Sequence, residues 1–284
     1  MSMARYHVLG YGEAREAGTK APIVRVVEHP GDPIATMPLQ GLFQWKVEGV
    51  RTCIGRTEEG RHVPCPTGTT TGEESQCMPC SGLEHPVCVF EPLCQGNAAG
   101  CACLTTFKGV EHAVYMAFYG TLPKVGMTQA WRIERRLREQ GADAYFVVQR
   151  GLDRAGARQT ERAVGMLYRI PEHRGHREVL PLLSRPVPWD LVARRAEETR
   201  ARLAERFPVG PDVQRITDHP ISQPLPGVPR RIPIEGRHAG TWMGAKGHNL
   251  FYAEAPKAGR LHLGMAPVAC LKGPELVGHY VETA

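Results

Sequence analysis

The sequence predicts an α+β protein in which a small mixed sheet with flanking helices lies between a cysteine-rich region and a β-rich C-terminal region. Three observations lead to this fold class. Residues 111–170 read as strand, turn, strand, helix, strand and helix. Eight of the nine cysteines lie between Cys53 and Cys103. Residues 237–284 alternate short apolar runs with glycine, a pattern typical of strands joined by turns.

These patterns divide the chain into three consecutive regions. Residues 1–110 carry the β-like runs 22–29 and 41–49 and then the cysteine-rich segment. Residues 111–210 form an α/β core and a following helix, 189–207, whose apolar residues recur at helical spacing. Residues 211–284 begin with five prolines between positions 219 and 236, which indicates a linker ahead of the β-rich end.

The composition is that of a globular protein. Hydrophobic residues make up 42% of the chain and charged residues 23%. No run of about 18 apolar residues is present, so the sequence predicts no transmembrane helix. The first residues also lack the apolar core of a signal peptide. We therefore expect a cytoplasmic protein with no membrane partner.

The positive charge is concentrated in the middle of the chain. The formal net charge is +6, and between Arg132 and Arg177 eleven arginines stand against six acidic residues. Such an excess favours an anionic partner. The alternative is an arginine-rich composition distributed over solvated helix faces.

Four cysteines have the spacing of one metal site. Eleven residues separate Cys53 from Cys65 and Cys65 from Cys77, and Cys77 and Cys80 form a C-x2-C pair. A C-x2-C turn directs two thiolates at one ion, and four thiolates complete a tetrahedral structural zinc site. Glycines follow closely after Cys53 and Cys65, which suits the tight turns of such a site.

The remaining clustered cysteines, Cys88, Cys94, Cys101 and Cys103, could form a second zinc site, in which His85 or His112 could replace one thiol. An interleaved grouping of Cys77 and Cys80 with Cys101 and Cys103 is an alternative. An iron–sulfur cluster also takes four thiolates, and reduced thiols or disulfides are the other options. We expect one to two structural zinc ions per chain.

An arginine-rich helix is expected over residues 129–140, with Thr128 as its cap. At 100° per residue, Ala130, Ile133 and Leu137 share one face. The opposite face carries Arg132, Arg135, Arg136 and Glu139. Composition alone is equally compatible with an amphipathic helix whose outer face is solvated.

The next helix, about 155–168, carries a carboxylate on its apolar side. Ala157, Glu161, Val164 and Tyr168 recur at helical spacing, so Glu161 is expected to point inward. A buried carboxylate needs a cationic partner, a proton or a metal ion. A salt bridge to an arginine is the alternative to a functional role.

Several isolated features have ordinary structural interpretations. Trp45, Trp131 and Trp242 could stack on bases, but core packing is the expected role. Cys270 is expected to be a small buried apolar residue. The glycine-rich segment 244–252 lacks the spacing of a phosphate-binding loop, and it predicts a hairpin turn.

In their order, these elements resemble the GIY-YIG nuclease superfamily over residues 111–170. "AVY", Ala113–Tyr115, stands at the GIY position, and "KVG", Lys124–Gly126, stands at the YIG position. "RRLREQG" resembles the family's arginine helix, and "RQTERAV" places Glu161 at the metal-binding glutamate. The cysteine-rich region ahead of the core would make this an atypical branch.

The resemblance implies a nuclease acting on DNA or RNA with one divalent ion. Tyr115 would act as the base, Arg135 or Arg136 would stabilise charge, and Glu161 would bind Mg or Mn. Lys124 departs from the family pattern, because it replaces the second tyrosine. Two alternatives follow: a catalytically degenerate, zinc-containing nucleic-acid-binding protein, or a small-molecule enzyme that reuses the scaffold.

Overall fold

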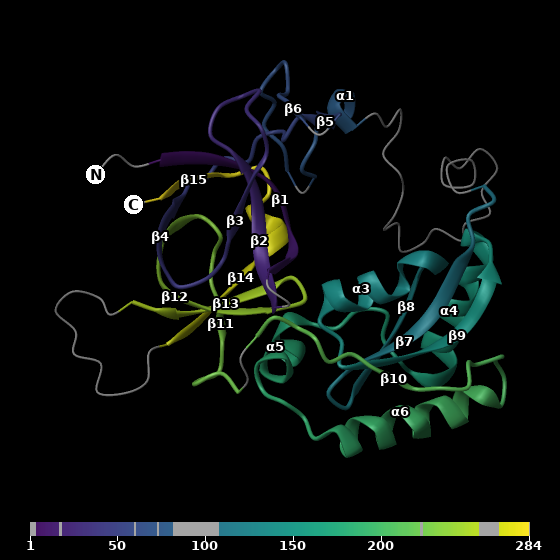
Figure 1. The fold of residues 1–284 in the computed structure, drawn as a ribbon. Helices are drawn as coiled ribbons and strands as arrows, with labels where there is room; N and C mark the ends of the chain where they lie inside the picture. Colours follow the sequence, from purple (N-terminus) through teal and green to yellow (C-terminus); the bar gives the residue numbers. More distant parts are fainter. Residues whose placement is uncertain are drawn as a thin grey trace. The chain divides into compact units, whose positions relative to one another are not determined.

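The computed structural model describes residues 4–16, 19–59, 61–72, 74–81, 108–221, 224–255 and 267–283, which form an α+β fold (Figure 1). The chain divides into two compact units. The first unit contains residues 1–84 and 220–284, and the second contains residues 85–219. In sequence, the second unit is therefore an insertion into the first.

A nine-stranded sheet dominates the first unit, in the order β11-β14-β13-β12-β4-β15-β1-β2-β3. The β11–β14 pair is parallel and the other neighbouring pairs are antiparallel. The strands are β1 (Ala4–Glu16), β2 (Thr19–Val27), β3 (Ala35–Pro38), β4 (Leu42–Val47), β11 (Arg230–Arg231), β12 (Gly236–Lys246), β13 (Asn249–Glu254), β14 (Val268–Lys272) and β15 (Tyr280–Thr283). The described part of the first unit also contains a short hairpin, β5 (Arg56–Glu58) and β6 (Arg61–Val63). It contains two short helices as well, α1 (Met78–Ser81) and α7 (Gly273–Leu276).

Distant strands of this sheet share one apolar core. Val24 of β2 and Leu271 of β14 belong to the same buried cluster, together with Trp45 and Trp242. Five strands separate β2 from β14 in the sheet. The sheet therefore curls around its own apolar face, and the curl buries the side chains that alternate inward along each strand.

The two ends of the chain meet in this sheet. β15 pairs with β1 on one side and with β4 on the other (Figure 1). β4 in turn pairs with β12. The three consecutive regions predicted from the sequence thus differ from the observed division, because strands from 1–110 and 211–284 build one sheet. Strand pairing over more than 200 residues leaves no local signature in composition.

The second unit is built on a four-stranded sheet in the order β10-β9-β7-β8. Its elements are β7 (His112–Tyr119), β8 (Leu122–Gln129), the 3-10 helix η1 (Ala130–Arg132), α3 (Ile133–Gln140), β9 (Ala144–Leu152), α4 (Arg154–Tyr168), α5 (His176–Ser184), α6 (Trp189–Ala204) and β10 (Gln214–Arg215). This confirms the predicted order of strands and helices. All neighbouring pairs are antiparallel, so the prediction of a mixed sheet was wrong.

Local sequence explains the elements of this unit. β7 is buried along its whole length, which suits its unbroken apolar run. Gly120, at φ 53°, lies in the two-residue turn into β8. The Asp153 carboxylate caps α4 by accepting from Gly156 N at 2.7 Å. Thr128 caps no helix, because β8 continues through Gln129 and α3 follows η1.

Candidate functional site

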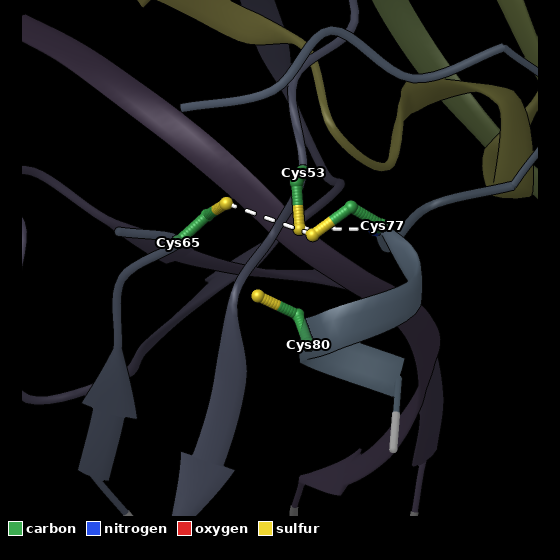
Figure 2. Close-up of side chains that lie close together, drawn as sticks. All are labelled: Cys53, Cys65, Cys77 and Cys80. Carbon is green, nitrogen blue, oxygen red and sulfur yellow. Dashed lines mark hydrogen bonds between the residues drawn. The ribbon is translucent and has the colours of Figure 1, made fainter. Parts of the chain in front are cut away.

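Four cysteines gather in the first unit, and their sulfur atoms lie within 4.8 Å of one another (Figure 2). Cys53 follows β4, Cys65 follows β6, Cys77 directly precedes α1, and Cys80 lies within α1. Cys53 and Cys80 are buried. This cluster is the first of the two groupings that the spacing predicts, and it could hold a metal ion.

Two tight turns bring these cysteines together. Gly55 has φ 66°, and a Cβ there would stand 2.1 Å from the Val63 carbonyl oxygen. Gly68 has φ 54°, and its N–H donates to the Cys65 carbonyl at 3.3 Å. Glycine tolerates both the left-handed backbone and the close approach. These positions confirm the prediction that the glycines after Cys53 and Cys65 form turns.

Backbone donors reach the cluster. The N–H groups of Gly55 and Cys77 donate to Cys53 Sγ at 3.4 and 3.2 Å. The sulfurs of Cys65 and Cys77 are 3.8 Å apart, far beyond a disulfide bond of about 2.05 Å. N–H groups directed at sulfur favour thiolates, the form that binds metal.

The cysteines of the cluster differ in the direction of their pKa shifts. Burial raises the pKa of the Cys53 and Cys80 thiols, whereas the Thr67 hydroxyl, followed by backbone hydrogen bonds, lowers the pKa of Cys65 to about 5. Without a positive charge the buried thiols of Cys53 and Cys80 stay protonated, and a bound cation would favour their thiolate forms. An all-sulfur donor set of four suits a closed structural site. The second predicted group, Cys88, Cys94, Cys101 and Cys103, and His85 lie outside the described residues.

A second group of side chains lies near the β7–β8 hairpin, and we call it the constellation: Tyr115, Lys124, Arg136 and Glu161, with Gln140 connecting them. Tyr115 pairs with Gly126, and Ala117 pairs with Lys124, so Tyr115 and Lys124 share one face of the hairpin. Tyr115 is buried. A Cβ on Gly126 would stand 2.7 Å from the phenol carbon and oxygen of Tyr115. The absence of a side chain at Gly126 therefore makes room for the Tyr115 ring.

Gln140, the last residue of α3, connects the members of this constellation. The hydrogen-bond network places its amide oxygen toward Arg136 Nε at 3.1 Å and Lys124 Nζ at 3.3 Å. In this orientation the amide nitrogen of Gln140 lies 3.5 Å from the Tyr115 hydroxyl and 3.3 Å from the Tyr119 hydroxyl. One neutral side chain thus joins two cations to two phenols.

The arginines of α3 separate into different environments. Arg136 acts electrostatically on both Tyr115 and Lys124. The Arg135 side chain is 70% exposed and donates to Glu139 at 2.9 Å. Of the two arginines that the resemblance offers, Arg136 therefore belongs to the constellation, and Arg135 lies on the outer face of the helix.

Glu161 is buried on the inner stripe of α4 with Ala157 and Val164, which confirms the predicted inward carboxylate. Its carboxylate accepts from Arg158 Nη1 at 2.5 Å, and the same nitrogen donates to Glu172 at 2.7 Å. Burial raises the pKa of Glu161 despite Arg158. The salt bridge that was the predicted alternative is thus present. The Glu161 charge also raises the pKa values of Lys124 and Tyr115.

Burial tunes the titrating groups of the constellation in opposite directions. It lowers the pKa of Lys124 to about 8, with Arg136 adding to the effect and Glu161 opposing it. It raises the pKa of Tyr115, so that phenol stays protonated at neutral pH. Perturbed groups that converge in this way are typical of functional sites.

Sequence reasoning did not include Tyr119 and Gln140 in this constellation. Tyr119 lies four residues after Tyr115 on the same strand, so the period of two would have placed it on the same face. Gln140 lies four residues after Arg136 on α3, the spacing that makes helical side chains neighbours. Both spacings can be read from the sequence, but they identify these residues only once the face of the strand and of the helix that carries the site is known.

The tryptophans divide between core and surface. Trp45 and Trp242 are buried together as predicted, and Cys270 is buried too. Trp131 is 72% exposed at η1, so the prediction of core packing was wrong for it. The segment 244–252 forms the β12–β13 hairpin with Gly247 in its turn, as predicted.

None of the helices in the described part of the chain is long and apolar enough to cross a membrane. No curated protein and no solved structure matches the chain significantly. A family model does match residues 43–255, a range that includes the cysteine cluster and the whole second unit. The chain therefore belongs to the family described as Protein of unknown function (DUF2797).

Proposed function

We propose that this protein cleaves phosphodiester bonds in DNA or RNA at the constellation of Tyr115, Lys124, Arg136 and Glu161, and that the cysteine cluster holds structural zinc. The observation that supports it best is the convergence of two cations, a phenol and a buried carboxylate from β7, β8, α3 and α4. These side chains match the groups that phosphoryl transfer requires: positive charge, a proton carrier and a metal-binding carboxylate.

Each side chain has a distinct part in this proposal. Arg136 and Lys124 supply positive charge toward the phosphate oxygens. Lys124, with its pKa near 8, can also exchange a proton near neutral pH. Tyr115 is better suited to donate a hydrogen bond than to act as the base, because burial raises its pKa. Gln140 positions Arg136 and Lys124 through its amide oxygen.

Glu161 is the residue that would hold a divalent ion. Its carboxylate oxygens are the donor type that Mg²⁺ and Mn²⁺ prefer, and Glu172 supplies a second carboxylate next to Arg158. An ion at Glu161 would compete with Arg158 for the carboxylate. When bound, such an ion would neutralise charge on the phosphoryl oxygens.

The test of cleavage uses the purified full chain with duplex, single-stranded and branched DNA and RNA, each with Mg²⁺ or Mn²⁺. Glu161→Gln should abolish nicking but keep binding within a few fold, because phosphate contacts to cations supply most of the affinity. Glu134→Gln, an exposed carboxylate change on α3, is the control and should cleave normally. Absence of metal-dependent nicking by the wild type on every substrate would refute the proposal.

The zinc assignment is tested separately by elemental analysis. The four sulfurs are enough ligands for one tetrahedral site, so the zinc assignment predicts at least one zinc ion and little iron per chain. A second ion would require the cysteines between 88 and 103. Less than half an equivalent of any metal, with freely titratable thiols in the folded protein, would contradict the assignment.

A second candidate function is nucleic-acid binding without hydrolysis. The observation that favours it is the 2.5 Å contact between Arg158 and Glu161, which already neutralises the carboxylate. In that case Arg136→Gln should lower the slope of log affinity against log salt by roughly one. Wild type and Glu161→Gln should then bind alike, and neither should cleave.

A further inference from the structure

A cavity of about 500 Å³ opens in the second unit. It is lined by the β7–β8 turn and the start of β8, the end of α4 and the segment that follows it, and α6 from Arg195 to Leu203. It is distinct from the constellation around Tyr115, whose side chains do not line it. Its volume lies within the range of small-molecule sites, roughly 300–1,000 Å³. Leu122, Tyr168 and Leu203 supply apolar wall.

Four arginines line this cavity: Arg169, Arg174, Arg195 and Arg202. Among the described residues that line it, none is acidic. Arg174 is fixed, because its Nε and Nη2 donate to the Pro123 carbonyl at 3.0 and 2.8 Å, and its Nη1 donates to Glu178 at 3.1 Å. Arg195 forms an ion pair with Glu198 at 3.7 Å on the exposed side of α6. Among the described residues, Arg169 and Arg202 have no ion-pair partner, so they leave positive charge on this concave surface, which attracts an anion.

The backbone of Arg169 provides a second, independent observation. Arg169 ends α4 in the left-handed conformation, at φ 53° and ψ 42°, and its N–H donates to the Gly165 carbonyl. Helices that end this way usually carry glycine there, because a side chain costs about 1 kcal/mol or more. The Arg169 side chain is exposed, so core packing does not account for it. A strained position that keeps an arginine on a cavity wall points to a ligand.

We infer that this cavity binds the phosphate group of a nucleotide-sized ligand, with the arginines on the phosphate and the apolar wall against the sugar and base. Arginine presents paired N–H donors that match phosphate oxygens. The ligand is either a free nucleotide or one nucleotide unit of a strand, and both present the same phosphate. The site does not depend on cleavage at Glu161.

Arg169 makes the decisive experiment possible. In Arg169→Gly the strained backbone is relieved, so the melting temperature should stay constant or rise. Affinity for adenosine monophosphate, measured by calorimetry without divalent ions, should fall about tenfold, as expected for loss of a charge-assisted hydrogen bond. Arg195→Gln should weaken binding similarly. Arg194→Gln, the same charge change one residue away and outside the cavity, should stay within about twofold.

Inorganic phosphate and a five-nucleotide single strand complete the set of probes. Binding of the mononucleotide identifies a free nucleotide as the source, and binding of the strand alone identifies nucleic acid. In either case Arg169→Gly must weaken binding and Glu161→Gln must not, which separates this site from the proposed cleavage site. The inference fails if no probe binds at millimolar concentration, if Arg169→Gly binds like wild type, or if Arg194→Gln and Arg195→Gln lose affinity equally.

Discussion

Lys124 shows at the scale of one residue how burial and charge oppose each other. Its ammonium group is enclosed by the second unit, with Arg136 of α3 repelling it and Glu161 of α4 attracting it. Burial dominates and lowers the pKa from 10.5 to about 8. Keeping this ammonium group charged therefore costs folding free energy, and groups with pKa values shifted in this way are concentrated at functional sites.

The pH dependence of stability tests this interpretation. The folded state releases the Lys124 proton at about pH 8 and the unfolded chain at about 10.5, so the unfolded state binds more protons between these values. Wild-type stability should therefore rise with pH across that interval relative to Lys124→Met. Between pH 7 and pH 10 the wild type should gain about 2–3 kcal/mol of stability relative to the variant. Chemical denaturation gives the free energy of unfolding of both proteins at pH 7 and pH 10. An equal change in the two proteins between these pH values would contradict the lowered pKa.

Gly126 is a second residue whose role is defined by its partner across the hairpin. Gly126→Ala puts a methyl group 2.7 Å from the Tyr115 phenol, which must then move. Overpacking of this kind costs about 1–3 kcal/mol. We expect a matching loss of stability and, if Tyr115 acts in cleavage, a loss of activity. Gly12→Ala in β1 is the control, because no atom lies within 4 Å of its added Cβ.

At the scale of elements, the cysteine cluster depends on its turns more than on regular structure. The hairpin β5–β6 has three residues in each strand, and α1 has four residues. Elements this short do not persist without packing or a ligand. The Gly55 N–H donates to Cys53 Sγ, and backbone groups of Thr67 and Thr69 reach Cys65, so we expect the turns to be needed to hold these thiols in place.

Gly55→Ala tests the turn directly. The added Cβ would stand 2.1 Å from the Val63 carbonyl oxygen, at a backbone φ of 66° that alanine disfavours. Zinc content should fall well below one equivalent, and the melting temperature should drop. Gly72→Ala, in the same segment with no atom within 4 Å of the new Cβ, should keep full zinc content. Equal zinc content in both variants would show that the turn does not form the site.

At the scale of the whole molecule, the first unit has two sources of stability. Its curled sheet encloses an apolar cluster that includes Trp45, Trp242 and Leu271. The cysteine cluster lies in the segment 51–81, which adds little to that core. Because the sheet has its own core, metal should be required locally and not for the entire unit.

Metal removal distinguishes these two sources. Treating the protein with a zinc chelator should increase amide hydrogen exchange in residues 51–81, since binding of structural zinc is coupled to folding of its ligands. Protection in β7 and β9 should stay unchanged, because these central strands belong to the other unit. Loss of protection throughout the chain would show that the metal stabilises the whole fold. Unchanged protection in residues 51–81 would contradict a structural metal at the cysteine cluster.

The sequence by itself determined the features that depend on local spacing. The C-x2-C pair and the glycines after Cys53 and Cys65 predicted the sulfur cluster, because short loops between ligands leave few arrangements. The 3.6-residue period predicted the helices and the inward direction of Glu161. A period is a property of consecutive residues, so no tertiary information is needed to detect it.

The tertiary structure alone decided what distant residues do together. It placed β15 between β1 and β4, and it selected Arg136 in place of Arg135 through the amide of Gln140. It also gathered Arg169, Arg174, Arg195 and Arg202 around one cavity. These outcomes follow from the packing of elements that are far apart in the chain. The free energy of that packing depends on how well two surfaces fit together, and the order of residues within one element does not reveal it.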